Sequence, residues 1–185
     1  MRLSELFREV EFDGSIKNDA DINLVTDDSR LVRPGSLFVC IRHRSFDGHT
    51  AAVDALASGA AAVVTQDRLG LENELRVADS RSAYARLCAA LCNHPERKLR
   101  MIGVTGTNGK TTVTTLIRNI LSDSGTKTLL TGTVCNRLGD ENLPSGLTTP
   151  KPPELYSLLS RAVSQRCKAC VMEASSQALA QGRLE

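Results

Sequence analysis

A glycine-rich stretch in the second half of the sequence contains the residue types that hold a polyphosphate. Residues 101–112 read MIGVTGTNGKTT, an apolar run followed by glycines, a lysine and two threonines. Glycines let backbone N–H groups curl around anionic oxygens, and the N-terminus of a following helix adds its partial positive charge. Lys110 can reach the β- and γ-phosphates of a nucleotide, and the Thr111 hydroxyl can bind the accompanying Mg²⁺. The predicted phosphate-binding residues are Gly106, Thr107, Asn108, Gly109, Lys110, Thr111 and Thr112.

The loop departs from the strict P-loop pattern, because Val104 stands where that pattern has its first glycine. A glycine-rich turn from a strand to a helix could also be purely structural. The segment after the loop favours a nucleotide site, because its apolar residues repeat at helical spacing and should pack on a sheet. These residues are Val113, Leu116, Ile117, Ile120 and Leu121.

Bulk composition describes an ordinary globular protein. The 185 residues suffice for one domain or two small ones, and 41% hydrophobic residues predict a packed core, mostly aliphatic because only 3% are aromatic. The net charge of +2 gives no reason to invoke nucleic acid or an anionic membrane. The sequence has no apolar stretch near the roughly 20 residues of a membrane span and no apolar signal-peptide core. We expect a cytoplasmic monomer that binds neither nucleic acid nor membranes.

Six cysteines raise the question of a metal site or disulfides. Cys167 and Cys170 form a single C-x-x-C pair, with no second pair at zinc-site spacing. Cys88, Cys92 and His94 could form a partial metal site, but a fourth ligand is not obvious. We predict that the thiols are buried or idle, because a free cysteine behaves as a small hydrophobic residue.

The first half of the chain alternates predicted strands and helices. We expect helices at residues 3–10, 51–59 and 84–91 and strands at 22–25, 37–41, 61–65 and 75–78. Gly59 is a plausible C-cap for the second helix. This alternation predicts an α/β domain over residues 1–97, with the linker at residues 96–98.

The second half, residues 98–185, begins with the strand that leads into the phosphate loop. Further strands are expected at 127–134 and 169–172, parallel to the first, with helices at 110–121 and 155–163 and a long loop at 136–153. Glu173 follows the last strand at its C-terminal end, where open α/β sheets place ligands. A sheet of three strands buries little surface, so we expect this domain to be truncated.

The loop from Gly106 to Thr112 resembles the ATP loop of the Mur ligases, which assemble the peptide of bacterial peptidoglycan. Folylpolyglutamate synthases and cyanophycin synthetases carry similar loops. Three further regions narrow the resemblance to the UDP-N-acetylmuramoyl-tripeptide synthetase branch (MurE), over essentially the whole chain. The first, similar to the family's uridine-nucleotide domain, contains Asp28-Ser29-Arg30, residues 34–39 and Asp47-Gly48-His49; the second is Thr148-Thr149-Pro150; the third is residues 172–179 with Gln181 and Arg183.

The resemblance implies a fold and a chemistry. The fold would be a small N-terminal α/β uridine-nucleotide-binding domain followed by the start of a P-loop α/β, Rossmann-like ATPase domain. ATP would phosphorylate the D-glutamate carboxylate of UDP-MurNAc-L-Ala-D-Glu, and an amino group of a diamino acid would attack the acyl phosphate. Lys110 and Mg²⁺ would stabilise the charge that develops on the transferring oxygens. The diamino acid, meso-diaminopimelate or L-lysine, cannot be read from these residues.

The resemblance also implies roles for individual residues. Lys110, Thr111 and Glu173 would be catalytic, and Thr111 and Glu173 would hold Mg²⁺. Ser29, Arg44, Ser45 and Phe46 would bind the uridine diphosphate end of the substrate. Thr148, Thr149, Ser175, Gln181 and Arg183 would contact the muramoyl-dipeptide. The family usually has histidine where Gln177 stands, and an amide cannot take up a proton as imidazole does.

Purely structural roles for these residues stay open. Glu173 could simply end a strand, and Thr148-Thr149-Pro150 could be an ordinary turn. In the family, a carbamylated lysine, a further metal-binding histidine and the amino-acid-binding domain follow the part that corresponds to this chain, so we expect the 185 residues alone to be inactive. The alternative function is that of a non-catalytic module that binds a UDP-sugar or nucleotide. A simple P-loop phosphotransferase is the third possible function.

Overall fold

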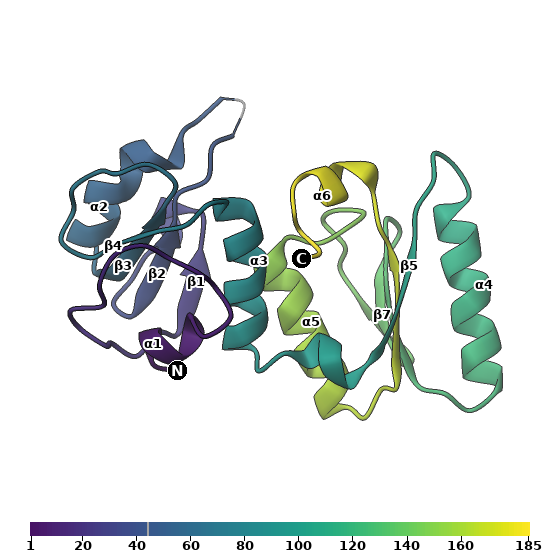
Figure 1. Cartoon of the computed structure of the whole chain (residues 1–185). Coiled ribbons are helices and arrows are strands. Elements are labelled where there is room, and N and C mark those ends of the chain that lie inside the picture. The colour runs from purple at the N-terminus through teal and green to yellow at the C-terminus, as the bar shows by residue number, and fades with distance from the viewer. Residues whose placement is uncertain (44) are drawn as a thin grey trace. The chain divides into compact units, whose positions relative to one another are not determined.

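The computed structural model describes residues 1–43 and 45–185. The chain forms two compact units, the first comprising Met1–Leu91 with Glu185 and the second Cys92–Leu184 (Figure 1). The boundary predicted at residues 97 and 98 lies a few residues after this division and stays a prediction. Among the described helices, none combines the length and apolar character that a bilayer span requires.

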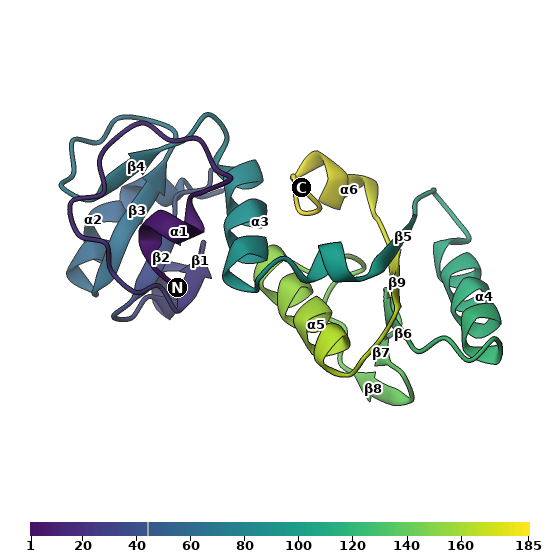
Figure 2. The ribbon, with the colours of Figure 1, turned by 60° about the horizontal axis from the view of Figure 1, so that its bottom comes forward.

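The first unit is built on a parallel sheet with the strand order β1-β2-β3-β4. The strands are β1 (Leu24–Thr26), β2 (Ser36–Val39), β3 (Ala60–Thr65) and β4 (Glu74–Arg76). The helices are α1 (Leu3–Leu6), α2 (Ala52–Ala57) and α3 (Ser80–Leu91), with short 3₁₀ turns η1 (Ser29–Leu31) and η2 (Gly48–Ala51). Helices α2 and α3 lie on opposite faces of this sheet (Figures 1 and 2).

The core of the first unit is aliphatic, as its composition predicts. Phe38 on β2 is fully buried and packs in a cluster with Ala52 and Ala55 of α2 and Val63 of β3. Alternate residues of a strand point to opposite faces, so Leu37, also fully buried, faces the α3 side. The position of Gly59, with φ +100°, fits the predicted C-terminal end of α2.

The second unit contains a mixed sheet in the order β5-β9-β6-β7-β8. Its strands are β5 (Arg100–Val104), β6 (Thr128–Thr131), β7 (Asn136–Leu138), β8 (Glu141–Leu143) and β9 (Ala169–Glu173). The helices are α4 (Lys110–Asp123), α5 (Pro152–Ser164) and α6 (Ser176–Ala180), and the 3₁₀ turn η3 is Pro95–Lys98. In both views α4 and α5 flank opposite faces of the sheet (Figures 1 and 2).

Strand β9 is the centre of the second unit. All five of its residues are buried, and β5 and β6 each pair with it in parallel. The predicted parallel arrangement is therefore confirmed, with β9 inserted between the other two strands. The carboxyl ends of all three strands meet at one edge of the sheet, which is where an open α/β sheet binds ligands. The predicted α/β fold class is confirmed.

The expectation that residues 136–153 form a long loop is wrong for its first part. Residues 136–143 form the hairpin β7–β8, and β7 pairs antiparallel with β6. Leu138 pairs with Glu141, which leaves Gly139 and Asp140 as a two-residue turn, and Gly139 has φ +58°. A Gly-Asp pair is a hairpin signal, but the strands on either side are too short and polar to show alternation.

The expectation that the apolar stripe of α4 packs on the sheet is also wrong for three of its members. Val113, Leu116 and Ile120 are 43%, 56% and 68% exposed. The buried residues of α4 are instead Thr114 and Arg118. Arg118 donates from Nη2 to the carbonyl oxygen of Gly139 at 2.9 Å, so a polar contact with the hairpin helps to set the rotation of the helix.

Phe38→Ala should destabilise the protein by about 3–5 kcal/mol, because it removes a fully buried ring and leaves a cavity under α2. The change is measured by urea unfolding. Phe46→Ala is the matched control, since Phe46 is 49% exposed and its loss should change stability by no more than about 0.5 kcal/mol. Equal effects of the two substitutions would contradict the packing described here.

Candidate functional site

The phosphate loop connects β5 to α4 and has the backbone that its glycines permit. Gly106 and Gly109 have φ values of +148° and +78°, in the region that favours glycine, and Gly109 is the N-cap of α4. No side chain caps this helix, so its first N–H groups point toward the loop. Lys110 folds back and donates from Nζ to the carbonyl oxygen of Gly106 at 2.7 Å. The loop therefore combines a helix N-terminus and an ammonium group, the two elements of an anion site.

Glu173 is the last residue of β9 and is only 2% exposed. Its Oε1 accepts hydrogen bonds from Thr111 Oγ1 at 2.9 Å and from the backbone N–H of Thr133 at 3.0 Å. Its Oε2 accepts from Thr133 Oγ1 at 3.0 Å. A Cβ placed on Gly132 would lie 2.3 Å from Oε1, so the carboxylate occupies space that only glycine leaves free. The structure thus brings together the two residues predicted to hold Mg²⁺.

The donor set around Glu173 fits a metal ion that is shared with phosphate. The donors to the Glu173 carboxylate are neutral, and in the described residues no group of three or more His, Cys, Asp or Glu side chains could hold a metal alone. Mg²⁺ is commonly held by one or two protein oxygens together with substrate phosphates and water. Thr111 and Glu173 supply two such oxygens beside the loop. A cavity of about 160 Å³, lined in part by Thr111, Thr114, Val134 and Glu173, leaves room beside them.

The segment after the hairpin contacts the same glutamate. Thr148 Oγ1 lies 3.0 Å from Thr133 Oγ1. Thr149 is 1% exposed, and its hydroxyl donates to the carbonyl oxygen of Glu173 at 2.7 Å and accepts from the N–H of Ser175 at 3.0 Å. Thr149 therefore contacts the backbone at the end of β9, and Thr148 contacts Thr133, which in turn holds the Glu173 side chain.

The residues after β9 fold back onto this segment. Ser175 is the N-cap of α6, and its hydroxyl accepts from the N–H of Ala178. Arg183 donates from Nη1 to the carbonyl oxygen of Thr149 at 2.9 Å and from Nη2 to Gln181 Oε1 at 2.6 Å. Four residues predicted to contact one ligand, namely Thr149, Ser175, Gln181 and Arg183, thus form one cluster.

A separate set of loops lies at the carboxyl edge of the first unit's sheet. Ser29 begins η1, directly after β1, and Ser45 and Phe46 follow the neighbouring parallel strand β2. The two loops touch, because His43 Nε2 lies 3.6 Å from Asp27 Oδ2. Burial and the charge of Asp27 raise the pKa of the Tyr84 hydroxyl, so it stays protonated and donates to Asp27 Oδ1 at 3.1 Å. Phe46 is half-exposed at this edge.

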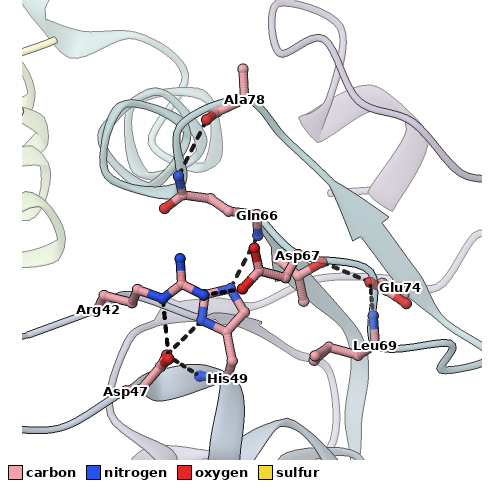
Figure 3. A network of polar contacts seen from close by, with 9 residues as sticks. Arg42, Asp47, His49, Gln66, Asp67, Leu69, Glu74 and Ala78 are labelled. Atoms are coloured by element: carbon pink, nitrogen blue, oxygen red, sulfur yellow. Dashed lines mark hydrogen bonds and ion pairs between the residues drawn. The ribbon is translucent and has the colours of Figure 1, made fainter.

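A polar network holds the loop that follows β2 (Figure 3). Asp47 Oδ1 accepts from the N–H of His49 at 3.0 Å and lies 2.6 Å from His49 Nδ1. The other ring nitrogen, Nε2, accepts from the backbone N–H of Gln66 at 3.1 Å, so Nδ1 carries the proton of the neutral ring. Arg42 pairs with Asp47 and with Asp67. Hydrogen bonds from the backbone N–H and the side chain of His49, together with one from the Arg42 side chain, lower the pKa of Asp47 to about 2.

Comparison with known proteins matches both units. Residues 21–94 match the family model described as "Mur ligase family, catalytic domain", and residues 104–185 match "Mur ligase middle domain". The chain belongs to the Mur ligase family. Two relatives, from Phocaeicola vulgatus and Geobacillus kaustophilus, are each named UDP-N-acetylmuramoyl-L-alanyl-D-glutamate--2,6-diaminopimelate ligase.

The Phocaeicola vulgatus ligase is 36% identical, and the match covers 100% of this chain and 39% of the ligase. The Geobacillus kaustophilus ligase is 43% identical, and the match covers 89% of this chain and 34% of the ligase. A solved structure of a ligase with the same name has a TM-score of 0.81 at 30% identity, and covers 100% of this chain and 38% of that chain. The chain therefore spans about two-fifths of the length of the Mur ligases it matches.

Most residues predicted from the Mur ligase motifs lie in two clusters. Lys110, Thr111 and Glu173 lie at the carboxyl edge of the second sheet, with the predicted muramoyl-dipeptide residues beside Glu173. Ser29, Ser45 and Phe46 lie at the edge of the first sheet, and Arg44 lies outside the described residues. Gln177, where the resemblance implies histidine, is an exposed residue of α6. These binding roles stay predictions.

Sequence reasoning missed Gly132 and Thr133. They directly follow β6, and a small and a polar residue at the end of a parallel strand is the available signal. The predicted strand over residues 127–134 included both residues, so they were not recognised as the residues that follow a strand end. Burial raises the pKa of the Cys40 and Cys170 thiols to about 12, so these two cysteines stay protonated at neutral pH.

Gly132→Ala should destabilise the chain by about 1–3 kcal/mol, because the new methyl group overlaps the Glu173 carboxylate. Gly146→Ala is the control, since a Cβ there meets nothing within 4 Å. Urea unfolding of the two variants measures the difference. Equal stability of the two alanine variants would show that the carboxylate does not occupy this position.

Asp47→Asn should lower the thermal midpoint by about 2–4 °C at pH 7, a modest shift because Asp47 is partly exposed. The pKa of Asp47 falls from 3.8 to about 2 on folding, so its contribution is present above about pH 4 and is lost as the pH falls through 2. The difference in thermal midpoint between wild type and variant should therefore narrow as the pH falls from about 4 to about 2. Asp54→Asn, on the exposed side of α2, controls for the lost charge. A gap that is constant with pH would count against the ionised form of Asp47 as the stabilising species.

Proposed function

We propose that this chain is the nucleotide- and substrate-binding part of an ATP-dependent amide ligase of peptidoglycan precursor synthesis. The reaction would join a diamino acid to UDP-MurNAc-L-Ala-D-Glu. The single observation that carries the proposal is the contact between Thr111 Oγ1 and the buried carboxylate of Glu173 at 2.9 Å. It supports the proposal because two oxygens that could hold Mg²⁺ lie beside a glycine-rich loop, and phosphoryl transfer uses a metal ion beside the phosphates.

The phosphate loop would act by binding and charge stabilisation. Lys110 and the uncapped N–H groups of α4 face the same loop, so they can contact the terminal phosphates together. ATP supplies the phosphoryl group that activates the D-glutamate carboxylate. Thr114, buried under the loop, bonds the carbonyl oxygens of Lys110 and Thr111 and so fixes the first turn of the helix. A fixed first turn preorganises the site.

Thr111 and Glu173 would hold Mg²⁺, which would neutralise charge on the β- and γ-phosphates. A buried carboxylate with only hydrogen-bond donors around it gains from a cation, because burial of an isolated charge is costly. The hydroxyl of Thr111 has lone pairs that a metal can use once its proton turns away from Glu173. Both residues serve this role without any change in the backbone.

The substrate would be bound by its two chemically different ends. Arg183, beside Gln181 and Thr149, suits the carboxylates of the muramoyl-dipeptide, because a guanidinium pairs with a carboxylate through two parallel hydrogen bonds. Thr149 is buried with its hydroxyl in use, so its part is to shape the loop for Thr148. Ser29, Ser45 and Phe46, with Arg44, would bind the uridine diphosphate end.

The diamino acid would be 2,6-diaminopimelate. The support is the shared name of the two relatives and of the solved structure at 30% identity. L-Lysine is the alternative that the sequence itself leaves open.

Ligand-induced stabilisation tests the proposal directly. Mg·ATP and UDP-MurNAc-L-Ala-D-Glu, each at about 100 times its dissociation constant, should each add about 2.7 kcal/mol to the free energy of unfolding. Lys110→Ala should remove most of the shift with Mg·ATP and leave the shift with the UDP compound. Calorimetry should show the matching loss of Mg·ATP affinity, at least about tenfold for a lost bond to a charged group.

Lys127→Ala is the matched control, because Lys127 is an exposed lysine of the same unit whose ammonium donates to Gln165 Oε1 at 3.1 Å, away from the phosphate loop. It should leave both shifts unchanged. Absence of any shift with Mg·ATP at millimolar concentration would defeat the ligase proposal. Stabilisation by the UDP compound alone would favour a non-catalytic UDP-sugar-binding module.

A further inference from the structure

Thr133 supplies two of the three hydrogen bonds that the structure gives the Glu173 carboxylate. Its N–H donates to Oε1 and its hydroxyl to Oε2, each at 3.0 Å, while Thr111 supplies the third bond. The two oxygens of the carboxylate are therefore oriented mainly by one residue. Gly132, directly before it, leaves the space that the carboxylate occupies.

The hydroxyl of Thr133 bridges Glu173 and Thr148. Thr133 Oγ1 lies 3.0 Å from both Glu173 Oε2 and Thr148 Oγ1, and it is the donor in both contacts. A hydroxyl has one proton, so the Glu173 carboxylate and the Thr148 hydroxyl share it. A ligand group that donates to Thr148, such as a peptide N–H, would compete with Thr133 for the lone pairs of Thr148.

We propose that Thr133 is a positioning residue that aims the Glu173 carboxylate at Mg²⁺ and links it to Thr148. This inference rests on the proposed function, because it assigns a role to Thr133 within the same nucleotide site. A donor that binds Thr148 displaces the Thr133 proton from Thr148 and leaves it to Glu173, because one proton serves both acceptors. Occupation of the 148–149 loop and binding of Mg·ATP are therefore coupled through Thr133.

The position of Thr133 makes it a clean target for substitution. Thr133 is exposed to solvent, unlike the buried Glu173 and Thr149. Thr133→Val keeps the backbone N–H bond and the side-chain shape and removes only the hydroxyl. The variant should therefore fold with the circular dichroism spectrum of the wild type and a thermal midpoint only a few degrees lower, because two of the three hydrogen bonds to Glu173 remain.

The test measures the affinity of the 185-residue chain for ATP by calorimetry, with Mg²⁺ and with EDTA. Thr133→Val should weaken Mg·ATP binding about tenfold, the value of one hydrogen bond to a charged group, and should leave ATP binding in EDTA within about twofold. Thr133→Ser restores the hydroxyl and should restore most of the affinity. Thr126→Val, at a threonine hydroxyl between α4 and β6, is the matched control and should change neither value.

A double-mutant cycle tests the link to Thr148. Thr148→Val removes the second acceptor of the Thr133 proton, so it should strengthen Mg·ATP binding about threefold in the wild type and should have no effect when Val already replaces Thr133. Additive effects would overturn the chain from Thr148 through Thr133. Equal losses with Mg²⁺ and with EDTA, or no loss in Thr133→Val, would overturn the positioning role while the wild type still binds Mg·ATP. A wild type that does not bind Mg·ATP would defeat the proposed function, and the inference with it.

Discussion

The burial of one carboxylate organises the second unit. Glu173 ends the central strand with 2% exposure, and the donors to its side chain are Thr111 in the first turn of α4 and Thr133 just after β6. A buried charge must be hydrogen-bonded, and these bonds tie β6, β9 and α4 to fixed relative positions. The rotation of α4 follows from this requirement, because the helix turns Thr111 toward Glu173 and Thr114 toward its own first turn. An apolar stripe on the same helix remains at the surface as a result.

Much of this arrangement could be predicted from the sequence. The spacing of apolar residues predicted most strands and helices of both units, and the Gly-Lys-Thr motif correctly predicted a strand, a glycine-rich loop and a helix in that order. Glu173 could be placed beside the loop because carboxyl ends of parallel strands share an edge. These inferences depend on local pattern and on a general rule of topology. Neither needs knowledge of individual contacts.

What could not be predicted depends on contacts between distant residues. The roles of Gly132 and Thr133 appear only when β6 lies beside β9, since Glu173 is 40 residues away from Thr133 in the chain. The hairpin of residues 136–143 is too short and polar for its alternation to be read. The orientation of α4 was mispredicted because hydrophobic periodicity cannot show which face meets a buried polar group.

Lys110 is hydrogen-bonded to the loop to which it belongs. Because its ammonium donates to the Gly106 carbonyl at 2.7 Å, any anion that engages Lys110 competes with this internal acceptor. The measured affinity of such an anion is therefore the difference between the Lys110–anion interaction and the Lys110–Gly106 hydrogen bond that it replaces. A small monovalent ion gains little from this exchange. A polyphosphate also supplies oxygens for the helix N-terminus. The loop should therefore favour anions of high charge density, whatever the shape of the rest of the ligand.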